Sequence, residues 1–385
     1  MIIKGGKVIT PSGEICADIR IDGDLITEIG ENLSGEDVID AEGCIVTPGF
    51  IDIHTHGGYE ADFMDSTDEA FEKALKFHLD NGTTTVVPTS CTAPTESIVR
   101  FLDFSRNWCK RGNTGNARVA GVHLEGPFLS VKNRGAQKLE QLASPDRDDY
   151  SYMVEYCDVI KTVTISPELP GAENMTRVLT SHGIVVSGGH DDGIYPEFMP
   201  AVEAGMTHLT HHFCAMSDLR FKDGKRNVGL REYALVDNNL TSELIADNRH
   251  IPPMLARLVV KCKGADNVCV VSDSLRAAGQ PRDGRVYKLG SDEDAVRFVI
   301  GDGVAVVENS ATFAGSITPV RKMVKNLIDA GISLTDAVKM GTSTPSRIIG
   351  EDKRIGSIEV GKLADVCILD SEFNLKTTVL GGKII

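Results

Sequence analysis

The chain has no Cys-x-x-Cys motif, and no apolar run approaches the length of a membrane span. Its nine cysteines are scattered and odd in number, which argues against a disulfide framework and against a zinc knuckle. They fit a reducing compartment. The first residues also lack the basic and apolar regions of a signal peptide. We therefore expect a cytoplasmic protein.

Long runs of lysine and arginine are missing too. The 385 residues include 40 Lys and Arg against 55 Asp and Glu, for a formal net charge of −15. Such a chain is a poor match to a nucleic-acid backbone or an anionic membrane surface, so we expect no nucleic acid and no membrane among its partners. With 41% hydrophobic residues, the composition is that of a globular protein with a large core.

Two histidines close a strand-like segment at residues 48–58, which read Pro-Gly-Phe-Ile-Asp-Ile-His-Thr-His-Gly-Gly. In an extended strand, His54 and His56 point to the same side, about 7 Å apart. The two glycines stop the strand, which suggests that both imidazoles lie at its carboxyl end, where loops surround them. The pair could share one metal ion or be two buried structural histidines, and the motif alone leaves both interpretations open.

The two ends of the chain are rich in short β-branched runs punctuated by glycine. The first 47 residues contain four such runs, with a hairpin signal at residues 22–24. The tail contains two more, the second of which folds at Gly381 and Gly382. We predict one small β-sandwich domain built from both termini, residues 1–47 with residues 357–385.

Between the ends, buried strand-like runs alternate with segments of helical apolar spacing. Counting the strand of His54 there are eight, and the other seven are residues 83–89, 117–125, 159–165, 183–187, 207–213, 241–246 and 267–273. Eight successive β/α units predict an α/β fold, a (β/α)8 TIM-type barrel over residues 48–356, with its active site at the carboxyl ends of the strands. The alternative is a doubly wound open sheet. It would concentrate its chemistry at one switch point, whereas here polar residues end several strands.

Beyond the eighth strand, residues 276–312 are rich in glycine and charge and predict loops and short hairpins over the barrel mouth. An apolar stripe then predicts a helix that begins at about Ser316 and ends at Gly331. A shorter helix is predicted over residues 334–340.

Side chains that commonly bind metals gather at the predicted strand ends. They are His54 and His56 at the first strand, Glu125 at the third, His190 after the fifth, His211 in the sixth and Asp273 at the eighth. Imidazoles and carboxylates are ligands of zinc, and iron and other divalent ions accept them too. We predict a site for one or two divalent ions, with zinc favoured.

The remaining histidines are expected to be structural. Within the sixth strand, His208 and His212 lie an odd number of residues from His211, so they face away from its side of the strand. The others in this group are His78, His123 and His182.

The ligand set indicates hydrolysis. A divalent ion there would activate water near neutral pH and polarise a carbonyl oxygen. A neighbouring group must also take a proton from the water and deliver it to the leaving nitrogen or oxygen. Asp273 is the candidate for this acid and base role.

Nine segments carry a family resemblance: residues 48–58, 122–128, 134–137, 188–190, 210–216, 243–250, 271–273, 314–316 and 356–365. They resemble the amidohydrolase superfamily and, within it, the N-acetylglucosamine-6-phosphate deacetylase family. The resemblance implies removal of an acetyl group from an N-acetylated amino-sugar phosphate. It also implies a metal held by Glu125, His190 and His211, a second ion on His54 and His56, and Asp273 as the catalytic acid and base beside the metal.

The resemblance further implies a set of substrate contacts. These are Ala136, Gln137, Cys214, Ala215, Asn248, Arg249, His250, Ala314 and Gly315. Arg226 resembles the arginine that binds the phosphate, a group that suits a planar guanidinium. The alternative for Arg226 and its basic neighbours is a solvated loop. In the family this region lies by a dimer interface, so a homodimer is expected.

The chain departs from the family pattern at three places near the substrate. Cys214 replaces an amide that contacts the substrate, residues 226–229 read Arg-Asn-Val-Gly instead of Arg-Glu-Pro-Gly, and Asp191 stands where Thr or Ser is common. The metal ligands and Asp273 are intact. A related substrate, such as N-acetylgalactosamine-6-phosphate, is therefore an alternative to the glucosamine epimer.

Two further functions remain as alternatives. One is a dihydroorotase-like or dipeptidase-like hydrolase, which would often use a carboxylated lysine at the end of the fourth strand. Lys161 lies instead near the start of that strand, and Glu125 offers the bridging carboxylate. The other is a catalytically dead barrel that acts as a sugar-binding module, against which the intact ligand set argues.

Overall fold

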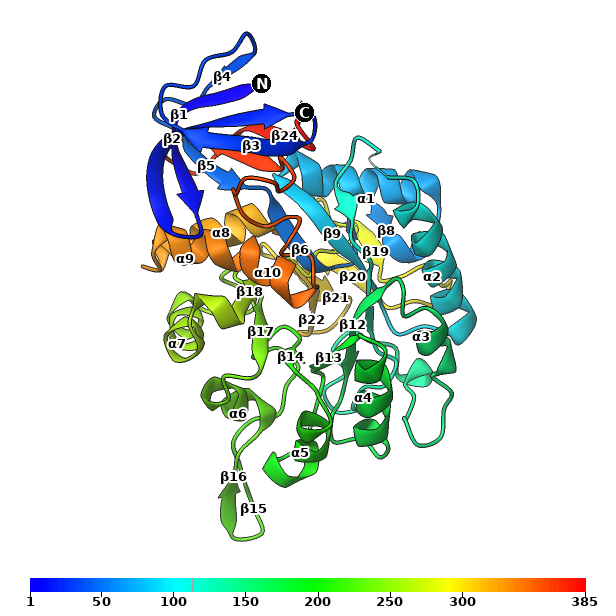
Figure 1. Cartoon of the computed structure of the whole chain (residues 1–385). Helices are drawn as coiled ribbons and strands as arrows, with labels where there is room; N and C mark the ends of the chain where they lie inside the picture. The colour runs from blue at the N-terminus through cyan, green and yellow to red at the C-terminus, as the bar shows by residue number, and fades with distance from the viewer. Residues whose placement is uncertain (113) are drawn as a thin grey trace.

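The computed structural model describes residues 1–112 and 114–385. The chain forms a barrel of parallel strands surrounded by helices, and a β-rich region made from both termini packs at one end of it (Figure 1). This architecture confirms the predicted fold class.

In the described residues, eight parallel strands form the barrel wall in sequence order. They are β6 (Phe50–Thr55), β9 (Thr83–Ser90), β11 (Val122–Glu125), β12 (Ile160–Ile165), β13 (Val185–Gly188), β14 (His208–Leu209), β17 (Thr241–Leu244) and β18 (Val268–Val270). Backbone hydrogen bonds from Asp273 N to His54 O and from His56 N to Ser274 O, both 2.9 Å, join the segment after β18 to β6. The barrel is therefore closed, which excludes the open doubly wound sheet.

Several of the predicted strands are shorter in the structure, and three of them differ most. Residues 117–125 divide into β10 (Arg118–Val119), which pairs with β9, and β11. The break falls at Gly121, which has a φ of 137° and whose Cβ, if present, would lie 2.6 Å from Val159 O. The sixth strand ends at Leu209 and the eighth at Val270. The placement of His211 within a strand, and the argument from alternating faces that rested on it, are therefore wrong.

Helices follow the strands and cover the barrel. They are α1 (Asp68–Asp80), α2 (Thr95–Cys109), α3 (Ser151–Glu155), α4 (Ala172–Ser181), α5 (Tyr195–Glu203), α6 (Leu230–Val236), α7 (Pro253–Lys263), α8 (Val320–Asp329), α9 (Leu334–Met340) and α10 (Ser343–Ile348). Short 3-10 turns are η1 (Phe63–Asp65), η2 (Leu139–Gln141) and η3 (Ala265–Asn267). The predicted short helix is confirmed as α9, whereas α10 was not predicted.

Helix α8 begins at Val320, later than its apolar stripe predicted. Ser316 instead extends the barrel, because its N–H donates to Asp273 O at 2.8 Å and its carbonyl accepts from Leu275 N at 3.1 Å. Pro319 then caps the helix, a position where its missing N–H costs nothing. From there Val320, Met323, Val324 and Leu327 are buried against the barrel, as the stripe predicted.

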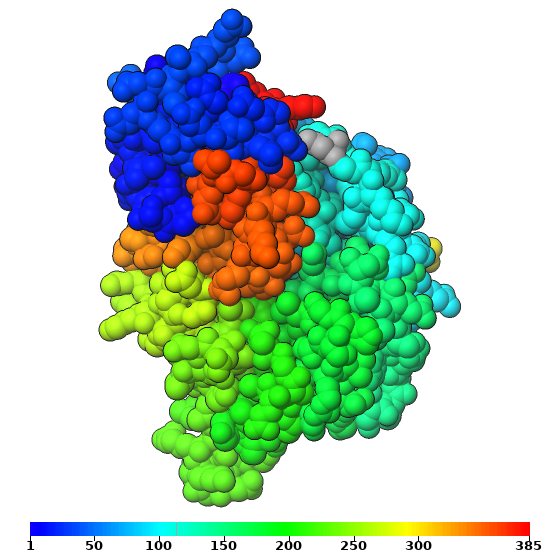
Figure 2. Space-filling view, viewed as in Figure 1, coloured from blue at the N-terminus to red at the C-terminus, as the bar shows by residue number. Residues whose placement is uncertain are grey.

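Three insertions stand at the barrel mouth and side. The predicted excursion after the eighth strand is an antiparallel sheet of β19 (Val286–Lys288), β20 (Arg297–Ile300), β21 (Ala305–Val307) and β22 (Phe313–Gly315). A short hairpin of β7 (Gly57–Gly58) and β8 (Ala61–Asp62) follows β6. A second hairpin, β15 (Arg220–Lys222) and β16 (Lys225–Asn227), projects from the body of the molecule (Figures 1 and 2).

Both termini contribute to one eight-stranded sheet. Its strands are β1 (Ile2–Thr10), β2 (Gly13–Asp22), β3 (Leu25–Gly30), β4 (Val38–Asp40), β5 (Ile45–Pro48), β23 (Val366–Leu369), β24 (Leu375–Leu380) and β25 (Lys383–Ile384). The two ends of this sheet approach each other. Ile26 N of β3 donates to Lys362 O, in the segment before β23, at 2.9 Å, so the sheet encloses a core of its own. Ile19, Val46 and Val366 are fully buried in that core.

The inside of the barrel is polar one layer below the strand ends. His123 Nε2 lies 2.7 Å from Thr164 Oγ1, which lies 2.6 Å from Thr210 Oγ1, and Ser187 Oγ completes the chain at 2.6 Å. Barrels of this kind are more often filled with branched apolar side chains, which here pack between the wall and the helices. Hydrogen bonds therefore support the groups at the mouth from below.

Candidate active site

The predicted ligands lie together at the carboxyl ends of the barrel strands. His54 is the penultimate residue of β6 and Glu125 is the last of β11, whereas His190, His211 and Asp273 follow β13, β14 and β18 in the left-handed region, with φ values of 49°, 30° and 46°. Such angles strain residues other than glycine and concentrate at functional sites. The turns bring His190 and His211 to Glu125 and bring Asp273 to His54 and His56.

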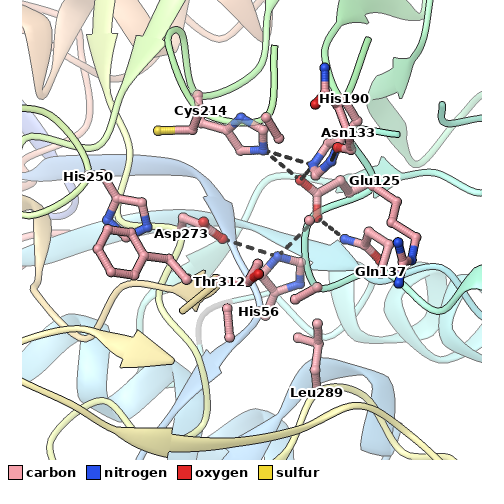
Figure 3. A pocket seen from close by; sticks show the side chains of 18 of the residues that line it. His56, Glu125, Asn133, Gln137, His190, Cys214, His250, Asp273, Leu289 and Thr312 are labelled. Carbon is pink, nitrogen blue, oxygen red and sulfur yellow. Dashed lines mark hydrogen bonds and ion pairs between the residues drawn. The ribbon is translucent and has the colours of Figure 1, made fainter. Parts of the chain in front are cut away.

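One group of ligands converges on Glu125 Oε1. This oxygen lies 3.1 Å from His190 Nε2 and 3.0 Å from His211 Nε2, and the two ring nitrogens are 3.0 Å apart (Figure 3). Three atoms that can donate lone pairs thus face one point. This is the arrangement of a metal-binding triad.

A second group shares the same glutamate. His56 Nε2 lies 3.5 Å from Glu125 Oε2, and His54 Nε2 lies 3.5 Å from Glu125 Oε1. Asp273 Oδ1 is 3.3 Å from His56 Nε2 and 3.6 Å from His54 Nε2. Within each group the three candidate ligand atoms lie within 4.8 Å of one another. Glu125 could therefore bridge two ions.

The chemistry of this cluster fits divalent ions. Glu125 and Asp273 are buried, at 3% and 8% exposure, and in the described chain they form ion pairs with imidazoles only. His54 Nε2 is buried without a hydrogen-bond partner among the described residues. Buried carboxylates and an unpartnered ring nitrogen are costly unless a cation satisfies them.

The electrostatics point the same way. Burial disfavours the charged imidazolium of His54, but the Glu243 and Glu125 carboxylates outweigh burial and raise its pKa to about 9. For His56, burial is likewise outweighed by Asp273 and Glu125, and the pKa rises to about 10. The cluster therefore attracts positive charge, which protons supply in part and divalent ions supply more fully.

Outer hydrogen bonds orient the ligands. His190 Nδ1 lies 2.8 Å from Asn133 O, which suits an N–H donor there and leaves Nε2 for the centre of the triad. Gln137 Nε2 donates to Glu125 Oε2 at 2.6 Å, while its Oε1 accepts from Thr92 N at 2.7 Å. The Gln137 amide is thus occupied in holding the glutamate.

A cavity of about 480 Å³ opens over the cluster. Seven residues predicted as substrate contacts line it: Ala136, Gln137, Cys214, Ala215, His250, Ala314 and Gly315. His250 faces the cavity beside Asp273, and Cys214 lies across from Gln137 (Figure 3). The antiparallel sheet β19–β22 supplies one wall through Phe313 to Gly315.

Three other predicted contacts lie outside that lining. Asn248 adopts a φ of 62°, and the turn sends Arg249 away to an ion pair with Asp302 at 2.9 Å. Arg226 is exposed on the projecting β15–β16 hairpin. These residues were placed in the site by resemblance alone, and their side chains do not line the pocket of their own chain.

Several lining residues were missed. They are Lys132, Asn133, Arg134, Gly135, Phe213, Leu289, Thr312 and Phe313. Arg134 was within reach of prediction, since it begins a segment that carries the resemblance. Asp247 was also missed: its Oδ2 lies 2.8 Å from His250 Nδ1, and its Oδ1 accepts from His250 N at 2.8 Å. It orients His250 toward the cavity.

The histidines expected to be structural have ordinary partners. His212 Nε2 lies 2.9 Å from Arg231 O, and His78 Nε2 lies 2.9 Å from Thr55 Oγ1. His182 is exposed at the end of α4. His123 and His208 belong to the polar interior of the barrel, where His208 contacts Thr241 and Glu243.

Lys161 is not near the cluster. It lies at the amino end of β12, where its Nζ is 3.1 Å from Glu351 Oε1. Lys161 therefore cannot bridge ions in this cluster as a carboxylated lysine, which argues against a dihydroorotase-like site.

Comparisons with known proteins agree with this geometry. The amidohydrolase family model matches residues 45–385. The chain is 31% identical to the N-acetylglucosamine-6-phosphate deacetylase of Bacillus subtilis, over 100% of this chain and 93% of that protein. It is 30% identical to the N-acetylgalactosamine-6-phosphate deacetylase of Escherichia coli O157:H7, over 90% of this chain and 88% of that protein.

A solved structure agrees as well. The N-acetylglucosamine-6-phosphate deacetylase from Pasteurella multocida superposes with a TM-score of 0.91 at 28% identity, over 100% of this chain and 99% of that chain. The closed barrel, the buried histidine and carboxylate cluster and the family match over nearly the whole chain lead to one conclusion. This chain belongs to the amidohydrolase family.

Proposed function

We propose that this chain is a metal-dependent deacetylase that converts N-acetylglucosamine-6-phosphate to glucosamine-6-phosphate and acetate. One observation carries the proposal: Glu125, His190 and His211 meet within about one hydrogen-bond length at the floor of a sugar-sized cavity, with Asp273 beside them. Full-length relatives with this activity support it.

The ligand roles follow from the two groups. Glu125, His190 and His211 would hold one divalent ion, and His54 and His56 with Glu125 a second, zinc being the ion that this donor set favours. Such an ion supplies a water nucleophile near neutral pH and polarises the acetamide carbonyl.

Asp273 moves the proton. Its carboxylate lies over the cluster at the cavity, with Oδ1 3.3 Å from His56 Nε2. In our scheme it accepts the proton of the attacking water and passes it to the departing amine of the sugar. Asp273 N donates to His54 O, and this backbone hydrogen bond fixes the position of Asp273 relative to β6.

Two arginines could bind the phosphate. Arg134 lines the cavity, and its Nε is buried without a hydrogen-bond partner in the described part of the chain. Arg226 lies on the β15–β16 hairpin, away from the cavity of its own chain. We propose that the chain forms a homodimer, in which the partner subunit's Arg226 reaches this cavity. The exposure of Phe221 on the same hairpin, at 72%, supports an interface there.

N-acetylgalactosamine-6-phosphate is the second candidate substrate. Cys214 lines the cavity where the family has an amide, and a relative with that activity is as similar as those that act on the glucosamine epimer. A thiol is a weaker hydrogen-bond partner than an amide. Recognition of a sugar hydroxyl is therefore expected to differ at this point.

The test is acetate release by zinc-loaded protein from both epimers and from unphosphorylated N-acetylglucosamine. We expect turnover of N-acetylglucosamine-6-phosphate that falls at least about a hundredfold in Asp273→Asn and is lost on chelation. His182→Asn, at an exposed histidine far from the cavity, is the control and should be unchanged. Turnover of only the galactosamine epimer would reassign the substrate, and no acetate from any of them by metal-loaded protein would refute deacetylation.

A further inference from the structure

Glu243 is a buried carboxylate that the scheme above leaves without a role. It lies in β17 at 2% exposure, below the two ligand groups, and the described residues that contact its oxygens are three histidines. An isolated carboxylate is costly at such a position. Its contacts with the histidines therefore indicate that it has a role in the metal cluster.

The first contact orients His54. Glu243 Oε2 lies 2.9 Å from His54 Nδ1, so the ring carries its proton on Nδ1 and donates it to the carboxylate. In the neutral ring, which is the form that binds a cation, Nε2 is then the atom with the free lone pair. This is the nitrogen that faces Glu125 and Asp273.

The second contact holds a ligand of the other group. The same Oε2 accepts the backbone N–H of His211 at 3.0 Å. His211 has a φ of 30°, so its backbone needs an outside partner to stay in this turn. A single oxygen atom thus fixes one residue in each of the two ligand groups.

The third contact fixes the carboxylate itself. His208 Nε2 lies 3.3 Å from Glu243 Oε1, and His208 Nδ1 lies 2.7 Å from Thr241 Oγ1. Both oxygens of Glu243 are engaged, so the side chain has one orientation. Its negative charge also makes His54 a stronger ligand for a cation.

We propose that Glu243 is the positioning residue of the metal centre: it sets the tautomer of His54 and the backbone of His211, and so couples the two ligand groups. The inference rests on the metal cluster of the proposed function. It does not depend on which substrate the enzyme takes.

The test compares Glu243→Gln with the unaltered protein for zinc affinity by chelator competition, and for the visible spectrum of the cobalt-loaded forms. Glutamine keeps the shape and can still accept from His54, but it lacks the charge. We expect zinc affinity to fall about 10- to 100-fold and the cobalt bands to shift. Asp18→Asn is the matched control, since Asp18 is a buried carboxylate of the terminal sheet that accepts from Gly5 N and Leu33 N.

A double-mutant cycle separates positioning from a general effect on the fold. With His54→Ala in the background, Glu243→Gln should change zinc affinity less, because the contact with the His54 ring is gone and only the one with His211 N remains. Equal affinity in Glu243→Gln and the unaltered protein, or an effect of equal size in both backgrounds, would overturn the proposal. Because no substrate is present, these results stand apart from the acetate assay, whose failure would bear on the deacetylase proposal alone.

Discussion

At the scale of single residues, the site is built from side chains that other side chains hold in place. Gln137 holds Glu125, Asn133 holds His190 through its carbonyl, and Asp247 holds His250. Burial alone would raise the pKa of the Asp247 carboxyl, but the His250 ring and two backbone N–H donors lower it instead. Asp247 is therefore an ionised partner for His250.

Asp247→Asn tests this support. The amide keeps the volume but turns an N–H toward His250 Nδ1, which favours the other tautomer of the ring. We expect kcat/KM to fall about tenfold, mainly because KM rises. This corresponds to about 1.5 kcal/mol, the free energy of one lost hydrogen bond to a charged group. Steady-state kinetics measure it. An unchanged KM would mean that His250 does not contact the substrate.

At the scale of elements, the β15–β16 hairpin has no functional role that is evident within a single chain. It projects from the body and carries Arg226 away from its own cavity (Figure 1). In the proposed homodimer, each site takes Asp273 from one subunit and Arg226 from the other. Arg226→Ala and Asp273→Asn therefore remove groups that different subunits supply to the same site. Arg134 and Asp273, in contrast, line one cavity of the same chain.

Mixing variants that are each impaired, assayed at a substrate concentration where each alone is nearly inactive, distinguishes these positions. Unfolded together and refolded, Arg226→Ala and Asp273→Asn chains should recover about a quarter of the wild-type activity, because half of the dimers are mixed and each has one intact site. Arg134→Ala mixed with Asp273→Asn should recover no more than the separate variants give. Recovery in neither mixture, or a monomer in sedimentation, would contradict an Arg226 that acts across a dimer.

At the scale of the whole molecule, Asp365 ties the terminal sheet to the barrel. Its side chain is 2.6 Å from Arg118 Nη1 of β10 and accepts from Gly381 N at 2.8 Å, while its carbonyl accepts from Gly49 N just before β6. Asp365 is 6% exposed. Removal of the carboxylate would take away the ion-pair partner that the structure shows for the mostly buried Arg118 guanidinium.

Asp365→Ala should lower the free energy of unfolding by about 3 kcal/mol, as expected when one partner of a buried pair is removed. Denaturant unfolding measures it. Lys73→Ala, which breaks the exposed pair with Glu69, should cause no measurable change. If Asp365→Ala is as stable as the unaltered protein, the two parts of the chain are held together by their apolar contacts alone.

Much of the fold was predictable because it depends on local periodicity. Alternation and apolar spacing located the barrel strands and α9, and the glycines located the hairpin turns of the terminal sheet. Strand ends were less predictable. Residues 207–213 look like one strand, but His211 turns away after Leu209 to meet Glu125, and that contact is with a different strand.

The sequence by itself determined which side chains are available for metal chemistry and that they stand at the ends of barrel strands. Only the tertiary structure decided which of the ten histidines face the same point, that Gln137 and Glu243 support ligands, and that Arg226 points away. The physical reason is distance along the chain. Periodicity reports on neighbours a few residues apart, whereas His54 and Glu243 are 189 residues apart and meet only because the barrel closes.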